Sequence, residues 1–418
     1  YDFSFIKCDV TRTVIKDLNA EGDNMDKLIR RANVVDVING KVNAKMNIFI
    51  QGDTIVEISN KDNIIDLAQC EVIDLEGCFV IPGLIDLHTH LIWSAGSDPV
   101  SIVEEEGIQV SLLHAAFNAR KTVEAGITTV RDLGSNENIA ISLAKSIERG
   151  YVVGPRVIAS GCTIIMTGGH DRFWGQQIDG EAEALKAVRN QVMMGAQVIK
   201  VSASGGVYGR SEGEEVGTAE LTYKELKVIC DEAHRFGLRV AAHSISEEGI
   251  WNCIKAGIDT IEHGHFLTET VMEKMKEDHI FWIPTLFVYR QIADGKGLPL
   301  YAVQKAREIV DIHRETFKKA LVKGVHLACG SDAGSPNTPH TALLNELECM
   351  VEYGCEPLDA LRKATYIAAQ ALGIEKHIGA LEIGKKADLL VASKNPLEDI
   401  SNLRSVIMVI KGGEKVGV

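Results

Sequence analysis

Between residues 79 and 331 the sequence alternates short strand-like apolar runs with longer helix-like segments, and this alternation restricts the fold more than any other feature. We count eight strand-like runs, at residues 79–88, 128–132, 156–160, 197–203, 238–243, 260–263, 281–285 and 325–331. Helix-like patterns lie between most of them, for example at residues 181–194, 223–236 and 301–322. Such alternation predicts a parallel sheet whose strands are connected by helices.

Glycine residues mark the ends of several of these helical segments. Each directly precedes the next strand, where glycine supplies the left-handed conformation that ends a helix. They are Gly126, Gly195, Gly237, Gly257 and Gly324. Eight such repeats predict an α/β protein of the (β/α)8 TIM-barrel type. The typical length of this fold is about 250 residues. The alternative is a doubly wound open sheet, which usually has fewer strands.

Both ends of the chain differ from the middle because they are rich in short strands. Near the N-terminus the strand-like runs are residues 28–37, 47–51, 54–58 and 71–75. Turn signals such as Asn39-Gly40 separate them, and residues 387–392 and 406–411 are again strand-like. We therefore predict a small β-sandwich domain built from residues 26–80 and 374–418, with the barrel at residues 81–373 inserted between them.

Charge and cysteine content limit the partners and the location of the protein. A net charge of −14 argues against a nucleic-acid partner, which needs clustered Lys and Arg. No apolar run reaches the roughly 18–20 residues of a membrane span. The nine cysteines form no Cys-x-x-Cys pair, and residues 1–24 have no basic stretch followed by an apolar one. We expect a cytoplasmic protein with reduced thiols that acts on a small molecule; the sequence leaves a homo-oligomer open.

The first strand-like run ends in two histidines, in the sequence IPGLIDLHTH at residues 81–90. Because side chains alternate along a strand, His88 and His90 point to the same side. Neutral imidazole is a good ligand for Zn, Fe, Ni or Cu. The pair therefore indicates a metal site, whereas the plainer interpretation is two hydrogen-bonded polar residues at a strand end.

Other potential ligands also lie at or near strand ends. In a (β/α)8 barrel the active site forms at the carboxyl ends of the strands, so these side chains should converge. They are Lys200 in the fourth strand, His243 at the end of the fifth, His263 at the end of the sixth and Asp332 after the eighth. Four imidazoles, one carboxylate and one lysine at one rim predict a metal centre.

Lys200 lies within an apolar strand, where a lysine would normally extend outward to solvent. If it is buried instead, its pKa falls and leaves a neutral nucleophilic amine. Such an amine can take up carbon dioxide and become a carbamate, an anionic ligand that can bridge two cations.

These features resemble the amidohydrolase superfamily, and within it the branch of imidazolonepropionase-like proteins and metal-dependent Xaa-Pro and related dipeptidases. The similarity extends from about Leu28 to the C-terminus. The motifs that carry it are residues 81–90, Gly168-Gly169-His170, Lys200 with Ser204-Gly205-Gly206, Ala242-His243, Glu262-His263-Gly264, Ser331-Asp332-Ala333-Gly334, residues 378–389 and Asn395-Pro396-Leu397.

The resemblance implies two divalent metal ions, expected to be Zn, with carbamylated Lys200 bridging them. The ligands implied for the first ion are His88, His90, Lys200 and Asp332. Those implied for the second are Lys200, His243 and His263. Imidazolonepropionases use one metal and no carbamylated lysine, so Lys200 favours the dipeptidase branch.

A reaction follows from this site. Metal coordination lowers the pKa of water to near 7 and so generates hydroxide at neutral pH. Asp332 is expected to accept the proton during attack and to return it to the leaving nitrogen. The resemblance implies that His170, on the loop after the third strand, donates to the oxyanion; a solvated loop histidine is the alternative. We predict a zinc-dependent binuclear amidohydrolase that cleaves a dipeptide (Xaa-Pro or another C-terminal residue) or an N-acyl amino acid.

Two other functions stay open at this point. A hydrolase of a cyclic amide, such as a lactam or imidazolone, or of another carboxamide would keep the same metal centre. Activity on ring amides together with inactivity on linear dipeptides would favour it. A non-catalytic metal-binding scaffold is the third hypothesis, but it would have no need of Asp332 as a proton shuttle.

Two features depart from the related dipeptidases. One is the loop after Asp332, where residues 335–341 replace the usual His-Gly arrangement. The other is the position of a substrate-binding Tyr. The dipeptidases often carry this Tyr two residues after the fifth-strand histidine, where it polarises the substrate, and this chain has Ile245. The candidates to replace that Tyr are Tyr208, Arg210 and Tyr289. Arg210 and His340 are candidates to bind a substrate carboxylate, because charge-assisted hydrogen bonds to carboxylates are strong.

Overall fold

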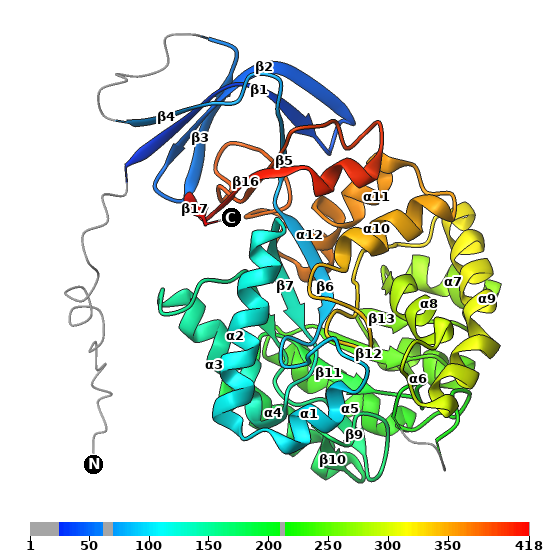
Figure 1. Cartoon of the computed structure of the whole chain (residues 1–418). Coiled ribbons are helices and arrows are strands. Elements are labelled where there is room, and N and C mark those ends of the chain that lie inside the picture. Colours follow the sequence, from blue (N-terminus) through cyan, green and yellow to red (C-terminus); the bar gives the residue numbers. More distant parts are fainter. Residues whose placement is uncertain (1–24, 62–69, 210–213, 418) are drawn as a thin grey trace, which may run out of the picture.

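Strands from both ends of the chain form one sheet in the computed structural model, which describes residues 25–61, 70–209 and 214–417. The strands are β1 (Asp26–Asp36), β2 (Lys41–Gln51), β3 (Thr54–Ser59), β4 (Cys70–Asp74), β5 (Phe79–Pro82), β15 (Leu389–Ala392), β16 (Val406–Lys411) and β17 (Glu414–Val416). Their order is β17-β16-β15-β5-β1-β2-β3, with β4 paired to β1. The blue and red ends of the chain accordingly lie together in Figure 1.

The two ends of the chain meet where β5 pairs antiparallel with β15, with Val80 opposite Val391. The sequence predicted that both ends contribute strands to one unit, and this pairing brings them into one hydrogen-bonded sheet. A two-layered sandwich and the domain boundaries at residues 80 and 373 stay predictions.

The middle of the chain contains parallel strands. They are β6 (Leu84–Thr89), β7 (Ile127–Asp132), β8 (Arg156–Ala159), β9 (Ile164–Met166), β10 (Gln176–Ile178), β11 (Ile199–Ser202), β12 (Val240–Ser244), β13 (Thr260–His263) and β14 (Phe281–Ile283). Two sheets result, ordered β6-β7-β8 and β10-β9-β11-β12-β13-β14, and every pair of neighbouring strands is parallel. The predicted parallel α/β organisation is confirmed, although β9 and β10 were not foreseen.

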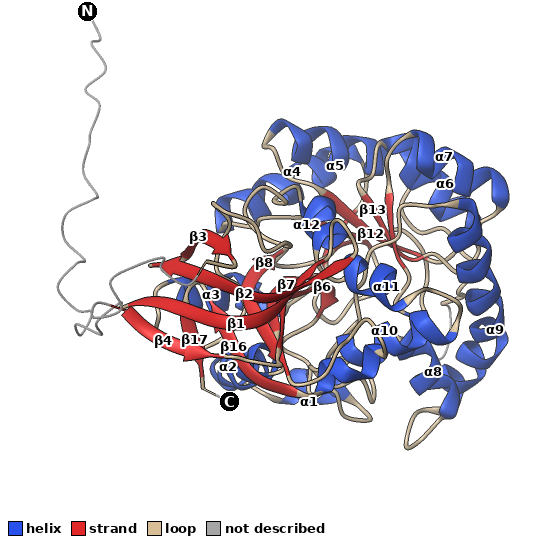
Figure 2. Cartoon of the chain, turned by 90° about the horizontal axis from the view of Figure 1, so that it is seen from above, coloured by secondary structure: helices blue, strands red, loops and turns tan. Residues whose placement is uncertain are grey.

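Helices connect these strands and lie on their outer side, as Figure 2 shows. They are α1 (Pro99–Glu105), α2 (Ile108–Glu124), α3 (Ile139–Glu148), α4 (Glu181–Met194), α5 (Tyr223–Arg235), α6 (Glu247–Ala256), α7 (Glu269–Glu277), α8 (Leu286–Asp294), α9 (Leu300–Lys323), α10 (Leu343–Glu352), α11 (Pro357–Lys363) and α12 (Tyr366–Leu372). As predicted, left-handed glycines end α4 at Gly195 (φ 100°) and α9 at Gly324 (φ 68°). In the described part of the chain no helix is both long and apolar enough to cross a lipid bilayer.

The first predicted strand, residues 79–88, is split at Gly83 into β5, which joins the small sheet, and β6, which joins the parallel sheet. A Cβ at Gly83 would lie 2.2 Å from the Thr128 hydroxyl oxygen. Only glycine permits this close approach to Thr128. The chain passes from one sheet to the other at this residue.

Hydrogen bonds connect the two parallel sheets at both ends. Between β8 and the residues that precede β11, the Gln197 N–H donates to the Ala159 carbonyl at 2.9 Å. At the other end, Ala328 of the eighth predicted strand donates to the Trp282 carbonyl of β14 at 3.0 Å.

The eighth predicted strand, residues 325–331, is not a regular strand, although it lies beside β6. Leu87 of β6 donates to the Cys329 carbonyl at 3.1 Å. One step further along, the Ser331 N–H bonds instead to the buried Asp86 carboxylate at 2.9 Å. This side chain replaces a backbone acceptor and interrupts the regular ladder.

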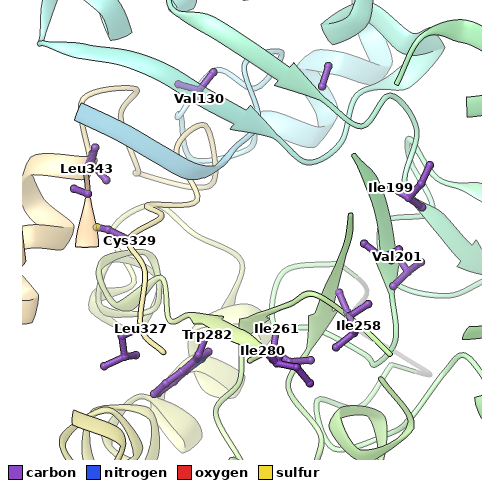
Figure 3. Packing of buried hydrophobic residues seen from close by; sticks show 14 of the residues in the cluster. Val130, Ile199, Val201, Ile258, Ile261, Ile280, Trp282, Leu327, Cys329 and Leu343 are labelled. Carbon is purple, nitrogen blue, oxygen red and sulfur yellow. The ribbon is translucent and has the colours of Figure 1, made fainter. Parts of the chain in front are cut away.

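The hydrophobic core surrounds the parallel strands. Figure 3 shows part of it, with Ile199 and Val201 of β11, Ile261 of β13 and Trp282 of β14, all fully buried. Because side chains alternate along a strand, Lys200, between two of these core residues, points to the opposite side. The core packing therefore directs Lys200 into the space enclosed by the strands.

Candidate active site

The six side chains predicted to hold metal ions line one buried cavity at the carboxyl ends of the parallel strands. Asp332 is the most exposed of them, at only 8%. They are His88 in β6, His90 directly after it, Lys200 in β11, His243 in β12, His263 at the end of β13 and Asp332 after the eighth strand-like segment. Burial of six polar side chains together requires compensation by partners or by a bound charge.

Distances between these side chains fit metal coordination. The Asp332 Oδ1 atom lies 3.7 Å from His88 Nε2 and 3.4 Å from His90 Nε2. His88, His263 and Asp332 offer ligand atoms that all lie within 4.8 Å of one another. Ligand atoms about 2.0–2.2 Å from a Zn ion are separated by similar distances, so the donor set fits a divalent cation.

Two of the imidazoles are oriented by hydrogen bonds at Nδ1. His88 Nδ1 donates to the Glu262 carboxylate at 2.9 Å, and His90 Nδ1 donates to the Gly134 carbonyl at 3.2 Å. A proton on Nδ1 leaves the lone pair of Nε2 free, and Nε2 faces Asp332. Metal-binding histidines typically have such partners on the second ring nitrogen.

The buried environment keeps the nitrogen ligands uncharged. Burial lowers the pKa of four imidazoles, to about 3 for His90 and well below the ordinary value for His88, His243 and His263. Burial also lowers the pKa of the Lys200 amine and raises that of the Asp332 carboxyl to about 6. Neutral imidazoles are the form that binds metal, and a lysine with a lowered pKa is the form that can be carbamylated.

A buried ion pair between Glu262 and Arg131 holds the hydrogen-bond acceptor of His88 in place. Glu262, which accepts from His88, also accepts from Arg131 Nη2 at 2.7 Å. The Arg131 Nε atom donates to the Leu87 carbonyl at 2.6 Å, and Nη1 donates to the Thr260 hydroxyl at 3.0 Å. Arg131 in β7 thereby connects β6, which carries His88, to β13, which carries His263.

Several residues of the site adopt left-handed backbone conformations, which are rare outside glycine. His263 has φ 71°, Asp332 has φ 57° and Thr285 has φ 52°. The Thr285 hydroxyl forms a hydrogen bond of 2.8 Å with His263 Nδ1. Strained conformations of this kind are concentrated at functional sites, where the surrounding structure maintains them.

His170 lies in the cavity lining, between β9 and β10, with its ring centroid 4.2 Å from that of His243. Its Nδ1 atom lies 2.6 Å from the Glu214 carboxylate. Burial lowers the pKa of His170, but the carboxylates of Asp171 and Glu214 outweigh this effect and raise the pKa to about 9. His170 is therefore a charged hydrogen-bond donor beside the predicted metal ligands.

The candidate substrate residues have different placements. Tyr208 and Tyr289 line the cavity. His340 is buried next to it without lining it, because its Nε2 donates to the Trp93 carbonyl at 2.8 Å. Arg210 lies outside the described residues. Ile245, the position that departs from the dipeptidases, is fully buried and contributes only apolar surface.

Sequence reasoning missed several residues of the site, among them Trp93, Asp171 and Glu214. Asp171 and Trp93 line the cavity, and Glu214 is the partner of His170. Asp171 directly follows His170, which was a usable signal. Glu214 is 44 residues from its histidine, in a loop for which the sequence has no local pattern.

A parallel α/β fold that gathers buried imidazoles, a lysine and a carboxylate at one end of its strands is an arrangement suited to hydrolysis. Residues 79–416 match the amidohydrolase family, and the chain belongs to this family. Ochratoxinase of Aspergillus niger is 33% identical over 371 residues, which cover 80% of this chain and 75% of that relative. Imidazolonepropionase of Geobacillus kaustophilus is 24% identical over 404 residues, covering 88% of this chain and 89% of that one.

Among solved structures, a Xaa-Pro dipeptidase with bound methionine in its active site is similar to this chain. It has a TM-score of 0.86 and 33% sequence identity, and the match covers 93% of this chain and 99% of the dipeptidase. The predicted membership of the amidohydrolase superfamily is confirmed, and the chain is a hydrolase of that family.

Proposed function

We propose that the protein is a zinc-dependent hydrolase with a binuclear metal centre that cleaves the amide bond of a dipeptide or an N-acyl amino acid. The observation that carries this proposal is the convergence of the six predicted ligand side chains on one buried cavity. Similarity to the Xaa-Pro dipeptidase structure favours a linear dipeptide as substrate.

We further propose that the parallel strands close into a (β/α)8 barrel. The hydrogen bonds from Gln197 to Ala159, from Ala328 to Trp282 and from Leu87 to Cys329 support this closure. Closure would place all predicted ligands around one mouth, which is the usual position of the active site in such barrels.

In this proposal His88, His90 and Asp332 would hold one divalent ion, and His243 and His263 would hold the other. The neutral Lys200 amine would add carbon dioxide and release one proton, and the resulting carbamate would be a further anionic ligand. When bound, the two cations would supply hydroxide at neutral pH and draw electron density from the scissile carbonyl.

The protein's own side chains move the proton and stabilise the developing charge. Asp332 accepts a proton during attack and returns it to the leaving nitrogen. His170 donates a hydrogen bond to the carbonyl oxygen as that oxygen becomes negative. Glu214 holds His170 in the orientation for this contact through its 2.6 Å bond to Nδ1.

The test combines metal analysis with a substrate panel. Purified protein loaded with zinc would be assayed against Xaa-Pro and other dipeptides, N-acyl amino acids and cyclic amides. We expect about two metal ions per chain and hydrolysis of a linear amide. His243→Asn should lose one ion and most activity. The matched control His326→Asn alters a half-buried histidine outside the cavity lining and should retain both.

The outcome separates the proposal from its alternatives. Activity confined to cyclic amides would leave the metal centre intact and replace the dipeptide assignment. Full activity of protein stripped of all divalent metals, or no metal binding by the wild-type chain, would refute the proposal itself.

A further inference from the structure

Tyr289 has a hydroxyl that is available for a hydrogen bond with a ligand in the cavity. It lies in α8, the helix that follows β14 (Figure 1), and its side chain lines the cavity together with His263 and Asp332. The residue is only 4% exposed. Within the part of the chain that the structure describes, no hydrogen bond engages its hydroxyl. A hydroxyl that lines a cavity and has no protein partner is available for a hydrogen bond to a ligand there.

Three imidazoles fix the orientation of the Tyr289 ring. The ring of His265 meets it edge-on at 4.1 Å between centroids and 84°, and those of His313 and His263 meet it at 5.4 Å and 5.5 Å. His265 and His313 stack on each other at 3.8 Å. Edge-to-face contacts are favoured geometries for aromatic rings, so the phenol is held in one position.

The stacked pair has one other contact with the site, because His313 hydrogen-bonds to the backbone of His263 and Pro284. The His265 and His313 side chains are at most 1% exposed. Both ring nitrogens of His265 and the Nε2 atom of His313 have no hydrogen-bond partner within the described residues. These rings therefore act mainly through packing, and Tyr289 is the side chain that joins them to the cavity.

Neither Ile245 nor Tyr208 offers an available donor next to Tyr289, which would act together with His170, the donor proposed above. Ile245, two residues after His243, packs with Tyr289 in one apolar cluster and offers only methyl and methylene groups. Tyr208 also lines the cavity, but its hydroxyl already donates to Asp98 at 2.9 Å. Of the two tyrosines in the lining, Tyr208 is engaged, whereas the Tyr289 hydroxyl has no hydrogen-bond partner among the described residues.

We infer that Tyr289 donates a hydrogen bond from its hydroxyl to the substrate carbonyl oxygen as that oxygen gains negative charge, and that His265 and His313 position it. This inference rests on the amide hydrolysis proposed above. Tyr289 keeps its proton throughout, because the proton that the leaving nitrogen needs comes from the attacking water through Asp332. The ordinary pKa of a tyrosine hydroxyl is about 10, and burial raises that of Tyr289 further, so the hydroxyl stays protonated at neutral pH.

The test is Tyr289→Phe, which removes one oxygen and preserves the ring. Loss of one oxyanion donor typically lowers kcat by about 10²-fold or more. We expect that loss with nearly unchanged KM, unchanged metal content and unchanged thermal midpoint. The matched control is Tyr353→Phe, which removes a hydroxyl from a partly buried tyrosine outside the cavity lining and should leave kcat unchanged.

A second readout separates binding from chemistry. A phosphonate analogue of the dipeptide, which mimics the tetrahedral oxygen, should bind Tyr289→Phe about 10-fold to 100-fold more weakly. The positioning role predicts that His265→Ala lowers kcat without raising KM, and that His265→Phe restores most of the loss by refilling the space beside the phenol.

The outcomes distinguish this inference from the proposed function. If the wild type hydrolyses an amide and Tyr289→Phe matches it in kcat and in phosphonate affinity, the role of Tyr289 is refuted while the proposed function stands. If the metal-loaded wild type hydrolyses no amide, the proposed function fails and the inference fails with it.

Discussion

Arg131 provides the sharpest test of how the parallel strands that carry the candidate ligands are held together. Its guanidinium is 1% exposed and donates to Leu87, Thr260 and Glu262 at 2.6 to 3.0 Å. Arg131→Met has a similar length but removes the positive charge and all of these donors. Glu262, which is fully buried, would then lose its cationic partner.

The expected cost follows from the loss of that partner. Removing one partner of a buried ion pair typically costs about 3–5 kcal/mol of unfolding free energy. A domain of ordinary stability has only about 5–15 kcal/mol in total. Arg131→Met should therefore lower the free energy of unfolding by at least about 3 kcal/mol, a large fraction of the whole.

The assay is urea unfolding of the metal-loaded protein, monitored by circular dichroism. The urea midpoints of the variants are compared where the unfolding free energy depends equally on urea concentration. The control is Arg120→Met, the same substitution at a solvent-exposed pair in α2, where Arg120 Nε lies 2.7 Å from Glu124. An exposed pair of this kind contributes about 0.5 kcal/mol or less.

The double variant Arg131→Met/Glu262→Gln tests whether the unpaired Glu262 carboxylate causes the loss of stability. It leaves no unpaired buried charge, so it should regain part of the stability that Arg131→Met loses. If Arg131→Met unfolds within about 1 kcal/mol of the wild type, or if the double variant is less stable than the single one, the buried-charge explanation is wrong.

Four further predictions concern the site and its supports. Asp332→Asn should lower kcat by about 10²-fold to 10⁴-fold while metal content is retained; near-normal turnover would contradict the proton-shuttle role. Treatment with a chelator should abolish hydrolysis and lower the thermal midpoint, and added zinc should restore both; activity that survives complete metal removal would contradict the metal centre. Thr285→Val removes the hydroxyl bonded to His263 Nδ1 and should weaken metal affinity about 10-fold to 100-fold, whereas Thr268→Val, at the N-cap of α7, should affect stability alone; equal metal affinities in titration calorimetry would count against this. Burial raises the pKa of the Glu346 carboxyl to about 8, above its unfolded value of about 4.3, so its contribution to stability is complete at low pH and is lost as the pH rises through the native value. The unfolding free energy of the wild type relative to Glu346→Gln should therefore fall between about pH 4.5 and pH 8, by up to about 1.4 kcal/mol per pH unit. If the unfolding free energies of the two proteins change in parallel with pH, burial does not shift the pKa of Glu346.

Local patterns were sufficient for much of the fold and for the candidate ligands. Helix α4 covers residues 181–194 as predicted, because its periodicity and Gly195 are local signals. The rule that barrel sites form at strand ends then selected His88, His243 and His263 from the thirteen histidines of the chain. These inferences need only the order of residues along each strand.

The tertiary structure decided everything that depends on contacts between distant residues. The partner of His88 is Glu262, 174 residues away, and the partner of Glu262 is Arg131, 131 residues away. No local pattern encodes such pairs, because they form only when neighbouring strands align in register. The pairing of β5 with β15 across the two ends of the chain has the same origin.

The same distinction applies to the residues that would contact substrate. The sequence identified Ile245 as a departure and named several replacements, but it had no means of choosing among them. Packing distinguishes two of them, because the Tyr208 hydroxyl is bonded to Asp98, whereas Tyr289 is held against His265 and its hydroxyl has no partner among the described residues. Residue types and their spacing therefore indicate the chemistry that the chain can perform. The arrangement of the side chains around a substrate depends on contacts that form only in the folded protein.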